Sequence, residues 1–590
     1  MRKSTLLAAA FAAFASPAPL MAQAPGQDSA VYDASCDREC LIGAVRAYVD
    51  ALRKRDPGAV PAAEGLTFTE NNVVLPLGKG LWGTVTDVDR TGLEVADTQT
   101  RNAAWFGSVR EKGEPAIFAV RIHVTNGKID QVESVVHRKG ALPAPFGDVT
   151  KMVHDPAFAE VLPPEKRRPR ERLRAIADSY FDTVELNDGQ VFAPFSDDCG
   201  RLENGISTTS NLNQRPGGNA AGIAEGCEAQ FKLGIYRINK RVRERQYPII
   251  DEERGVVVAT GFFDHANEWD RYKLTDGREM KTALKWPNSI TLLEAFQITD
   301  AQIHRIEAVF TYVPYFMHNP FAGPGSTAPQ YKIDPTSCDA ACLTGLARQV
   351  MGAYVSKDWK TLPWADKVGN AENSVGIQVG EGNWGSITAV DAKPLIVADP
   401  STGKAVWIGR IEEHGQPAWG AFTVSGAGGK ITAIDALVRR KEYGPPYAEP
   451  TAAPSFPVLP AKSRTARAEM LSGVEGFYQA IARQDGRAPA GLAKNCQWAV
   501  NGVTLSPCPA PFTGRLLQSL EQIRDRKVLA VDEERGLVAV STFEDFPATG
   551  QDAQTYPRTQ QVVELFRFNK GQIERVEAYT AELPYGMKPH

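Results

Sequence analysis

Residues 68–89 read FTENNVVLPLGKGLWGTVTDVD, and residues 370–391 read NAENSVGIQVGEGNWGSITAVD. The two stretches align without a gap, and each follows a Cys-Asp-x-x-Cys motif. Such self-similarity over a long sequence distance indicates an internal duplication. The alignment keeps a glutamate, an asparagine, glycines and a tryptophan: Glu70/Glu372, Asn71/Asn373, Gly78/Gly380, Gly80/Gly382, Trp82/Trp384 and Gly83/Gly385.

A second pair of repeats lies later in each half. Residues 247–262, YPIIDEERGVVVATGF, match residues 528–543, VLAVDEERGLVAVSTF, and residues 305–317 resemble residues 575–587. Each half therefore contains an A-type and a B-type segment, as expected for a chain too long for a single core. The predicted divisions are a signal peptide (1–24), module A (30–142), module B (165–320), module A′ (332–446) and module B′ (462–590), joined by Pro-rich linkers.

All four modules share one plan. Apolar residues at helical spacing predict a helix near each module's start, at 41–53, 172–184, 343–355 and 467–482. A tight turn and long alternating strands follow, because paired Asn and Gly residues favour hairpins. The last strand is predicted to begin at Lys128, Gln302, Lys430 and Gln572, and it carries an acid at Glu133, Glu307, Asp435 and Glu577.

This order of a helix followed by a curved sheet, whose last strand begins with a Lys-Ile or Gln-Ile pair and carries an acid, resembles the SnoaL-like and nuclear-transport-factor-two-like superfamily. The resemblance implies an α+β fold of four cone-shaped modules, each with N-terminal helices packed on a curved antiparallel sheet around an open-ended pocket. It also implies pairing through the outer sheet face. We expect A to pair with B inside one chain, and a homodimer is a further expectation. Fold analogy alone does not give function.

The N-terminus is typical of an export signal. Arg2 and Lys3 precede an apolar run at 6–14, and Ala22-Gln23-Ala24 supplies small residues for cleavage after Ala24. The apolar run is too short to span a bilayer. We predict a periplasmic or secreted protein with no membrane association after cleavage, and an uncleaved anchor is the alternative.

The eight cysteines support export, because disulfides form in oxidising compartments. Their positions predict four bridges: Cys36 with Cys40, Cys199 with Cys227, Cys338 with Cys342, and Cys496 with Cys508. A metal or haem site is the alternative, but CxxC and CxxCH motifs do not occur in the sequence. We predict neither metal nor cofactor.

The formal net charge of −4 gives no electrostatic reason to expect nucleic acid or an acidic membrane as partner. A small-molecule substrate is the expected partner. Superfamily enzymes such as ketosteroid isomerase, scytalone dehydratase, polyketide cyclases and epoxide hydrolases use pocket carboxylates and histidines, usually without a cofactor. The resemblance therefore implies a lyase, isomerase or hydrolase that uses acid/base catalysis, since burial in an apolar cone moves a carboxyl pKa toward neutrality.

Module B is the predicted site because the two B-type copies differ in their polar residues. Asp198, Arg201, Glu203 and His265 of module B correspond to Asn495, Trp498, Val500 and Phe546 of module B′. Such asymmetry within a duplicated chain indicates one working site and one scaffold copy.

We predict His265 as the general base or acid, Asp264 or Asp198 as its partner, and Glu203 and Glu307 as inward-facing acids. Tyr236 would stabilise an oxyanion, and Arg201, Asn204 and Arg243 would bind substrate. Each residue has a structural alternative: Asp264 and Glu307 have acidic counterparts elsewhere in the chain, and His265 begins a polar loop. The alternative function is a non-catalytic ligand-binding or assembly protein.

Overall fold

A computed structural model describes residues 36–590 except 141–143, 210–224, 283, 324, 326–328, 445, 515, 516, 518 and 550–555. The predicted signal peptide lies outside the described residues. Residues Cys36–His590 form one unit, in which all four modules are contained. Among the described residues, the helices are all too short or too polar to cross a membrane.

Each module begins with a helix of 17 residues at the predicted place: α1 (Arg38–Lys54), α3 (Arg170–Leu186), α6 (Ala340–Ser356) and α8 (Arg467–Arg483). In the A-type modules the Cys-Asp-x-x-Cys motif forms the helix start. The Asp37 carboxylate accepts a hydrogen bond from the Cys40 amide at 3.0 Å, and Asp339 accepts one from Cys342 at 2.8 Å. These side chains satisfy amides that lack a partner at a helix N-terminus.

The A-type modules each contain a seven-stranded sheet, ordered β2-β1-β7-β6-β5-β3 in module A with β4 also paired to β5. Module A contains η1 (Pro57–Ala59), β1 (Ala62–Glu70), β2 (Val73–Leu75), α2 (Leu81–Thr84), β3 (Val85–Val88), β4 (Leu93–Asp97), β5 (Asn102–Glu111), β6 (Glu114–Thr125) and β7 (Lys128–Arg138). Module A′ repeats it with η4 (Trp359–Thr361), β16 (Trp364–Glu372), β17 (Val375–Gly376), α7 (Asn383–Ser386), β18 (Ile387–Val390), β19 (Leu395–Asp399), β20 (Lys404–Glu413), β21 (Gln416–Ala427) and β22 (Lys430–Arg439).

The B-type modules each contain a six-stranded sheet, ordered β10-β11-β14-β15-β8-β9 in module B. After η2 (Pro156–Ala159) and η3 (Pro164–Lys166), module B contains β8 (Phe195–Glu203), β9 (Ile206–Ser207), α5 (Cys227–Leu233), β10 (Arg241–Asp251), β11 (Val256–His265), β12 (Arg271–Lys273), β13 (Glu279–Lys281), β14 (Asn288–Thr299) and β15 (Gln302–Val313). After η5 (Lys441–Tyr443) and η6 (Ala461–Ser463), module B′ contains β23 (Leu492–Val500), β24 (Val503–Pro507), α9 (Ala510–Thr513), β25 (Gln522–Asp532), β26 (Leu537–Phe546), β27 (Arg558–Asn569) and β28 (Gln572–Pro584).

The sheets are mixed, which refines the antiparallel prediction. In every module the first strand pairs in parallel with the last: β1 with β7, β8 with β15, β16 with β22, and β23 with β28. The other strand pairs of the described chain are antiparallel. In module B this pairing places Glu307 and Ala308 of β15 opposite Leu202 and Glu203 of β8.

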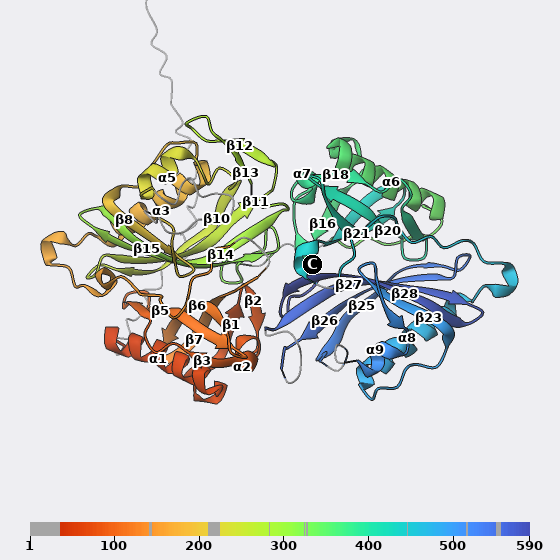
Figure 1. Ribbon diagram of the computed structural model, residues 1–590, viewed down its shortest axis with the longest axis horizontal. Helices are drawn as coiled ribbons and strands as arrows, with labels where there is room; N and C mark the ends of the chain where they lie inside the picture. Colours follow the sequence, from red (N-terminus) through yellow and green to blue (C-terminus); the bar gives the residue numbers. More distant parts are fainter. Residues whose placement is uncertain are drawn as a thin grey trace, which may run out of the picture. The chain divides into compact units, whose positions relative to one another are not determined.

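Within each half the two sheets pack face to face, and the helices cover the opposite face of each sheet (Figure 1). Phe106 and Ile117 of module A meet Ile249, Val258 and Leu293 of module B in one buried cluster. The second half repeats this packing. Because successive strand residues point to opposite faces, one set faces this interface and the alternate set faces the interior beneath the module's own helices.

Two further junctions join the halves. The lysine belongs to the B-type module at one junction and to the A-type module at the other, and the glutamate belongs to the opposite module each time. At the junction of modules B and A′, Lys240 Nζ lies 3.4 Å from Glu381 Oε2. At the junction of modules B′ and A, Lys79 forms an ion pair with Glu521. The repeat alignment makes Glu521 the counterpart of Lys240 and Glu381 the counterpart of Lys79.

Candidate functional site

The interior of module B contains a cluster of polar side chains beneath helix α3. Cys199 belongs to the module core, so strand alternation places Arg201 and Glu203 of β8 on the same inner face. Leu292 and Phe296 of β14 also belong to this core, and Glu294 lies between them. The inner face therefore holds one cation and two acids, which are uncommon inside an apolar core.

Arg201 is the centre of this cluster. Its side chain is 2% exposed, and Nη2 donates to the Tyr236 hydroxyl oxygen at 2.6 Å and to the Gln230 amide oxygen. Nη1 lies 3.4 Å from Oε1 of Glu203, whose side chain is 15% exposed. The cluster thus extends from a buried guanidinium to a partly exposed carboxylate, and burial raises the pKa of Tyr236 to about 12.

Glu294 is the most unusual acid of the cluster. The residue is 2% exposed, and its Oε2 has no hydrogen-bond partner within the described chain. Burial, followed by the charge of Glu203, raises the Glu294 pKa to about 8, while Arg201 and Tyr180 act in the opposite direction. Glu294 therefore keeps its proton near pH 7 and can donate it, as a general acid must.

Module B′ keeps the acid but has a different charged neighbour: Glu544 stands at the position of Phe263 and faces the same interior, and burial and the charge of Glu564 raise its pKa to about 8. Glu564 occupies the position of Glu294, and the Tyr478 hydroxyl donates to its Oε2 at 2.5 Å. Burial raises the Glu564 pKa to about 7. Trp498 replaces Arg201 and packs against Phe477 and Phe512. The predicted replacement of Arg201 by Trp498 therefore changes the interior of the module and not its surface.

The structure places His265 outside this cluster. His265 ends β11 with an exposed fraction of 4%, and its Nδ1 lies 2.9 Å from the Asn288 amide oxygen. Burial lowers its pKa, so the neutral imidazole is favoured. The small pocket beside it has a volume of about 30 Å³, which suits water better than an organic substrate.

Asp264 does not bond to His265, because it is held by arginines. Its Oδ2 accepts from Arg243 Nε at 2.8 Å, and its Oδ1 accepts from the Ser289 hydroxyl at 2.6 Å. Asp545 and Arg524 of module B′ form the same pair at 2.7 Å. An ion pair present in both copies serves the shared fold. It engages both Asp264, the predicted partner of His265, and Arg243, a predicted substrate-binding residue.

Asp198 and Glu307 also point away from the predicted site. Asp198 has a side chain 62% exposed, and it contacts His304 and Arg305 on the neighbouring strand. Glu307 follows the core residue Ile306, so alternation turns it to the other face of the sheet, where Oε1 lies 2.6 Å from His154 Nδ1. Glu307, which was predicted as an inward-facing acid, therefore faces away from the module interior.

Asn204 is engaged by the backbone. Its amide donates to the Phe310 carbonyl and accepts from the Phe310 amide, both at 3.0 Å. Asn71 bonds to Val136 in the same way in module A. These bonds hold the turn after the first strand against the last strand, which accounts for an asparagine in all four modules.

Of the predicted site residues, Arg201, Glu203 and Tyr236 come together. Glu294, Gln230 and Tyr180 were not predicted. The signal for Glu294 is a glutamate inside the apolar run ITLLEAFQI at 290–298, repeated in VVELFRF at 562–568. Alternation places that glutamate on the face of Leu292 and Phe296.

The four predicted disulfides are confirmed: Cys36–Cys40, Cys199–Cys227, Cys338–Cys342 and Cys496–Cys508. The second closes β8, which carries Arg201, onto α5, which carries Gln230. Such bridges fit a protein of an oxidising compartment outside the cytoplasm. Among the described residues, His, Cys, Asp and Glu side chains do not gather into a group that could hold a metal ion.

Comparison with protein families finds one match, to a family described as a domain of unknown function, DUF8021. The match covers residues 166–310 and 463–580, which lie in modules B and B′ and make up less than half of the chain. The same family matches twice, as expected for two copies of one module. No curated protein matches the sequence.

Several solved structures are similar to about one fifth of the chain. A proposed polyketide cyclase from Xanthomonas campestris pv. campestris has 25% identity over 19% of this chain and 90% of its own, with a TM-score of 0.17. An LEH-like epoxide hydrolase from M. tuberculosis has 15% identity over 19% of this chain and 84% of its own, with a TM-score of 0.15. An NTF2-like protein from Burkholderia xenovorans LB400 has 15% identity over 20% of this chain and 92% of its own, with a TM-score of 0.15. In each of its four modules a helix covers one face of a mixed sheet, which is the α+β arrangement predicted from the sequence.

Proposed function

We propose that this protein is an exported enzyme that transfers a proton to or from a small aromatic or sugar-derived molecule inside module B. The reaction belongs to the lyase, isomerase or hydrolase class and uses the chain's own side chains for acid/base catalysis. The observation that carries this proposal is Glu294, a buried acid with an unpartnered oxygen beside Arg201 and Glu203.

In this proposal Glu294 is the general acid, since its raised pKa keeps a proton available near pH 7. Arg201 and Tyr236 are donors placed to stabilise negative charge that develops on a substrate oxygen, because charge-assisted hydrogen bonds are strong in a dry interior. Glu203 balances Arg201 and connects the cluster with the partly exposed surface. Export is supported by the four disulfides.

The test is a turnover screen of the chain without residues 1–24 against phenolic ketones, sugar lactones and small epoxides, with Glu294→Gln and Glu564→Gln as a matched pair. Both changes replace a buried carboxyl at the same strand position with a group of the same shape. We expect Glu294→Gln to lose about 10²–10⁴-fold in kcat, the usual contribution of acid/base catalysis, and Glu564→Gln to keep wild-type turnover.

Equal turnover of Glu294→Gln and wild type would remove the chemistry from module B. Equal loss in both variants would indicate a stability effect common to the two modules. Saturable binding of a screened compound without turnover would favour the second function, a non-catalytic ligand-binding protein. The polar cluster is also compatible with that function, since its donors and acceptors could hold a ligand.

A further inference from the structure

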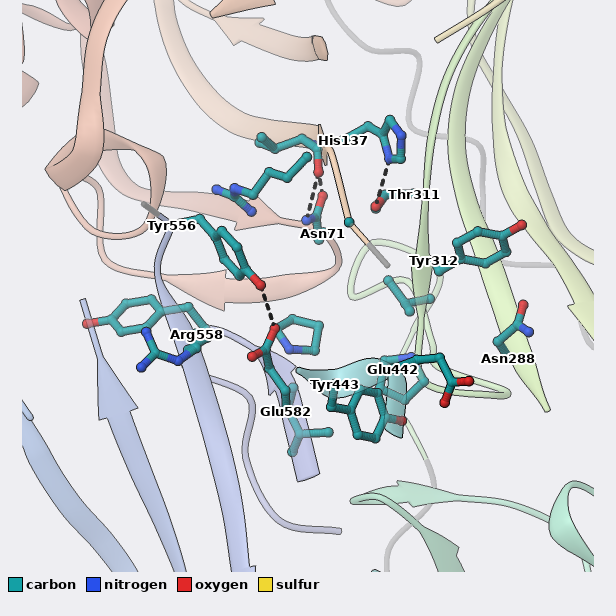
Figure 2. A pocket seen from close by; sticks show the side chains of 18 of the residues that line it. Asn71, His137, Asn288, Thr311, Tyr312, Glu442, Tyr443, Tyr556, Arg558 and Glu582 are labelled. Carbon is teal, nitrogen blue, oxygen red and sulfur yellow. Dashed lines mark hydrogen bonds between the residues drawn. The ribbon is translucent and has the colours of Figure 1, made fainter. Parts of the chain in front are cut away.

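A cavity of about 660 Å³ lies where all four modules meet, apart from the module B cluster. It is lined by Arg138 of module A, Tyr312 of module B, Tyr443, which follows module A′'s last strand, and Tyr556 of module B′. Tyr312 and Asn288 face it from one side, and Tyr556, Arg558 and Glu582 face it from the other (Figure 2). Its volume falls within the range of about 300–1,000 Å³ that is typical of small-molecule sites.

The strongest charges of the wall are paired with one another. Arg138 donates to Glu111 Oε2 at 2.5 Å and to Glu70 Oε1 at 2.8 Å. On the other half of the wall, Arg440 donates to Glu372 Oε1 at 2.7 Å. Burial raises the pKa of both Glu70 and Glu372, and the neighbouring arginines act in the opposite direction. The two arginines of the wall are therefore already paired with glutamates of the wall.

Ring faces lie between these polar groups. Trp286 and Tyr556 occupy equivalent positions in modules B and B′, each followed by a proline, and both line the cavity. The Tyr556 hydroxyl donates to Glu582 Oε1 at 3.0 Å, which fixes the orientation of this ring and its carboxyl. Tyr312 and Tyr443 add two more rings (Figure 2).

The two halves of the wall differ in polarity. Asn288 of module B stands where module B′ has Arg558, and Tyr312 stands where it has Glu582. One side therefore presents neutral amide and phenol groups, and the other presents a cation and an acid. A ligand that contacts both sides must both donate and accept hydrogen bonds.

We propose that this central cavity binds an uncharged polyhydroxylated ring, that is, a neutral mono- or disaccharide. Hydroxyl groups donate to the carboxyls and accept from Asn288 and Arg558, because a hydroxyl is both donor and acceptor. The C–H faces of a sugar ring pack against Trp286 and Tyr443. Because Arg138 and Arg440 already donate to glutamates of the wall, a carboxylate on the ligand would have to compete with them for either guanidinium.

The test is calorimetric titration of the full mature chain with cellobiose, maltose, lactose and chitobiose, with benzoate and benzylamine as charged ring compounds. We expect at least one neutral disaccharide to bind with a dissociation constant below 1 mM, as is common for carbohydrates held by several hydrogen bonds. Trp286→Leu is expected to weaken that binding at least tenfold. Tyr556→Phe removes a single hydroxyl and should weaken it about three- to tenfold in a chain that folds as the wild type does.

Glu294→Gln is the control, since this residue lies inside module B and outside the cavity wall. It should bind the disaccharide as the wild type does even if its turnover is lost, so the failure of one proposal can be told from the failure of the other. Absence of binding by all four sugars, tighter binding of benzoate or benzylamine, or sugar binding unchanged in both cavity variants would each overturn the proposal.

Discussion

Modules B and B′ have the same strand order and the same buried acid, but different side chains surround this acid in the two modules. In module B′ a tyrosine donates to Glu564, and Trp498 packs against other aromatic rings. In module B the acid lies beside Arg201, Glu203 and an ordered set of polar side chains, and one of its oxygens has no partner. The comparison teaches that the two modules surround one retained acid with different polar groups, Arg201 and Glu203 in module B and Glu544 in module B′.

The largest expected effect follows from breaking the charge balance of module B. Arg201→Met leaves Glu203 without its cation, and removing one partner of a buried ion pair typically costs about 3–5 kcal/mol. The double variant Arg201→Met/Glu203→Val, which approaches the Trp498 and Val500 of module B′, should recover at least about 1 kcal/mol. Urea unfolding measures both. A double variant as unstable as the sum of its single changes would contradict the interpretation that the two residues are coupled.

The second effect compares the bridges of the two modules. Cys199–Cys227 closes 28 residues, and Cys496–Cys508 closes 12. Loop-closure entropy predicts costs of about 3.6 and about 2.8 kcal/mol when each pair is changed to alanine. Thermal unfolding should therefore show the larger loss for module B. A larger loss for module B′ would mean that packing around Cys508, which is fully buried, outweighs the entropy of the loop.

The third effect is a difference in pH dependence. An acid whose pKa is raised on folding binds its proton more tightly in the folded chain, so its contribution to stability falls as pH rises. For Glu294 this fall extends from about 4.5 to about 8, whereas in module B′ the neighbouring acids Glu544 and Glu564, with pKa values raised to about 8 and about 7, titrate jointly. Urea unfolding at pH 5, 7 and 8.5 should show that the free energy of unfolding of Glu294→Gln rises relative to that of the wild type up to the highest pH. A Glu294→Gln variant whose free energy of unfolding follows that of the wild type across this pH range would contradict the assignment.

The smallest effect concerns His265, which module B′ replaces with Phe546. We expect His265→Phe to change the free energy of unfolding by less than about 1.5 kcal/mol, since a fully buried Phe fits the equivalent site, and to leave turnover within tenfold. The main loss is the bond to Asn288. A hundredfold loss of turnover with normal stability would instead establish His265 as the general acid or base.

The repeats predicted the helices, the last strands and the disulfides, because each depends on local spacing. The difference between the two B-type copies also singled out Arg201 and Glu203, which the structure brings together. His265, Asp198 and Glu307 were assigned to the site from their chemistry and not from the face on which they lie, and Glu307 next to the core residue Ile306 illustrates the difference. The central cavity depends on how four modules meet, and one module's spacing carries no information on that.

The exchanged charges at the two junctions restrict which copies of a half can associate. Two copies of the first half arranged like the natural pair would bring Lys240 of one near Lys79 of the other, and two copies of the second half would bring Glu521 near Glu381. Like charges oppose both arrangements, whereas the unlike halves meet as acid and base. The two halves are therefore not interchangeable, although their sequences are duplicates of one another.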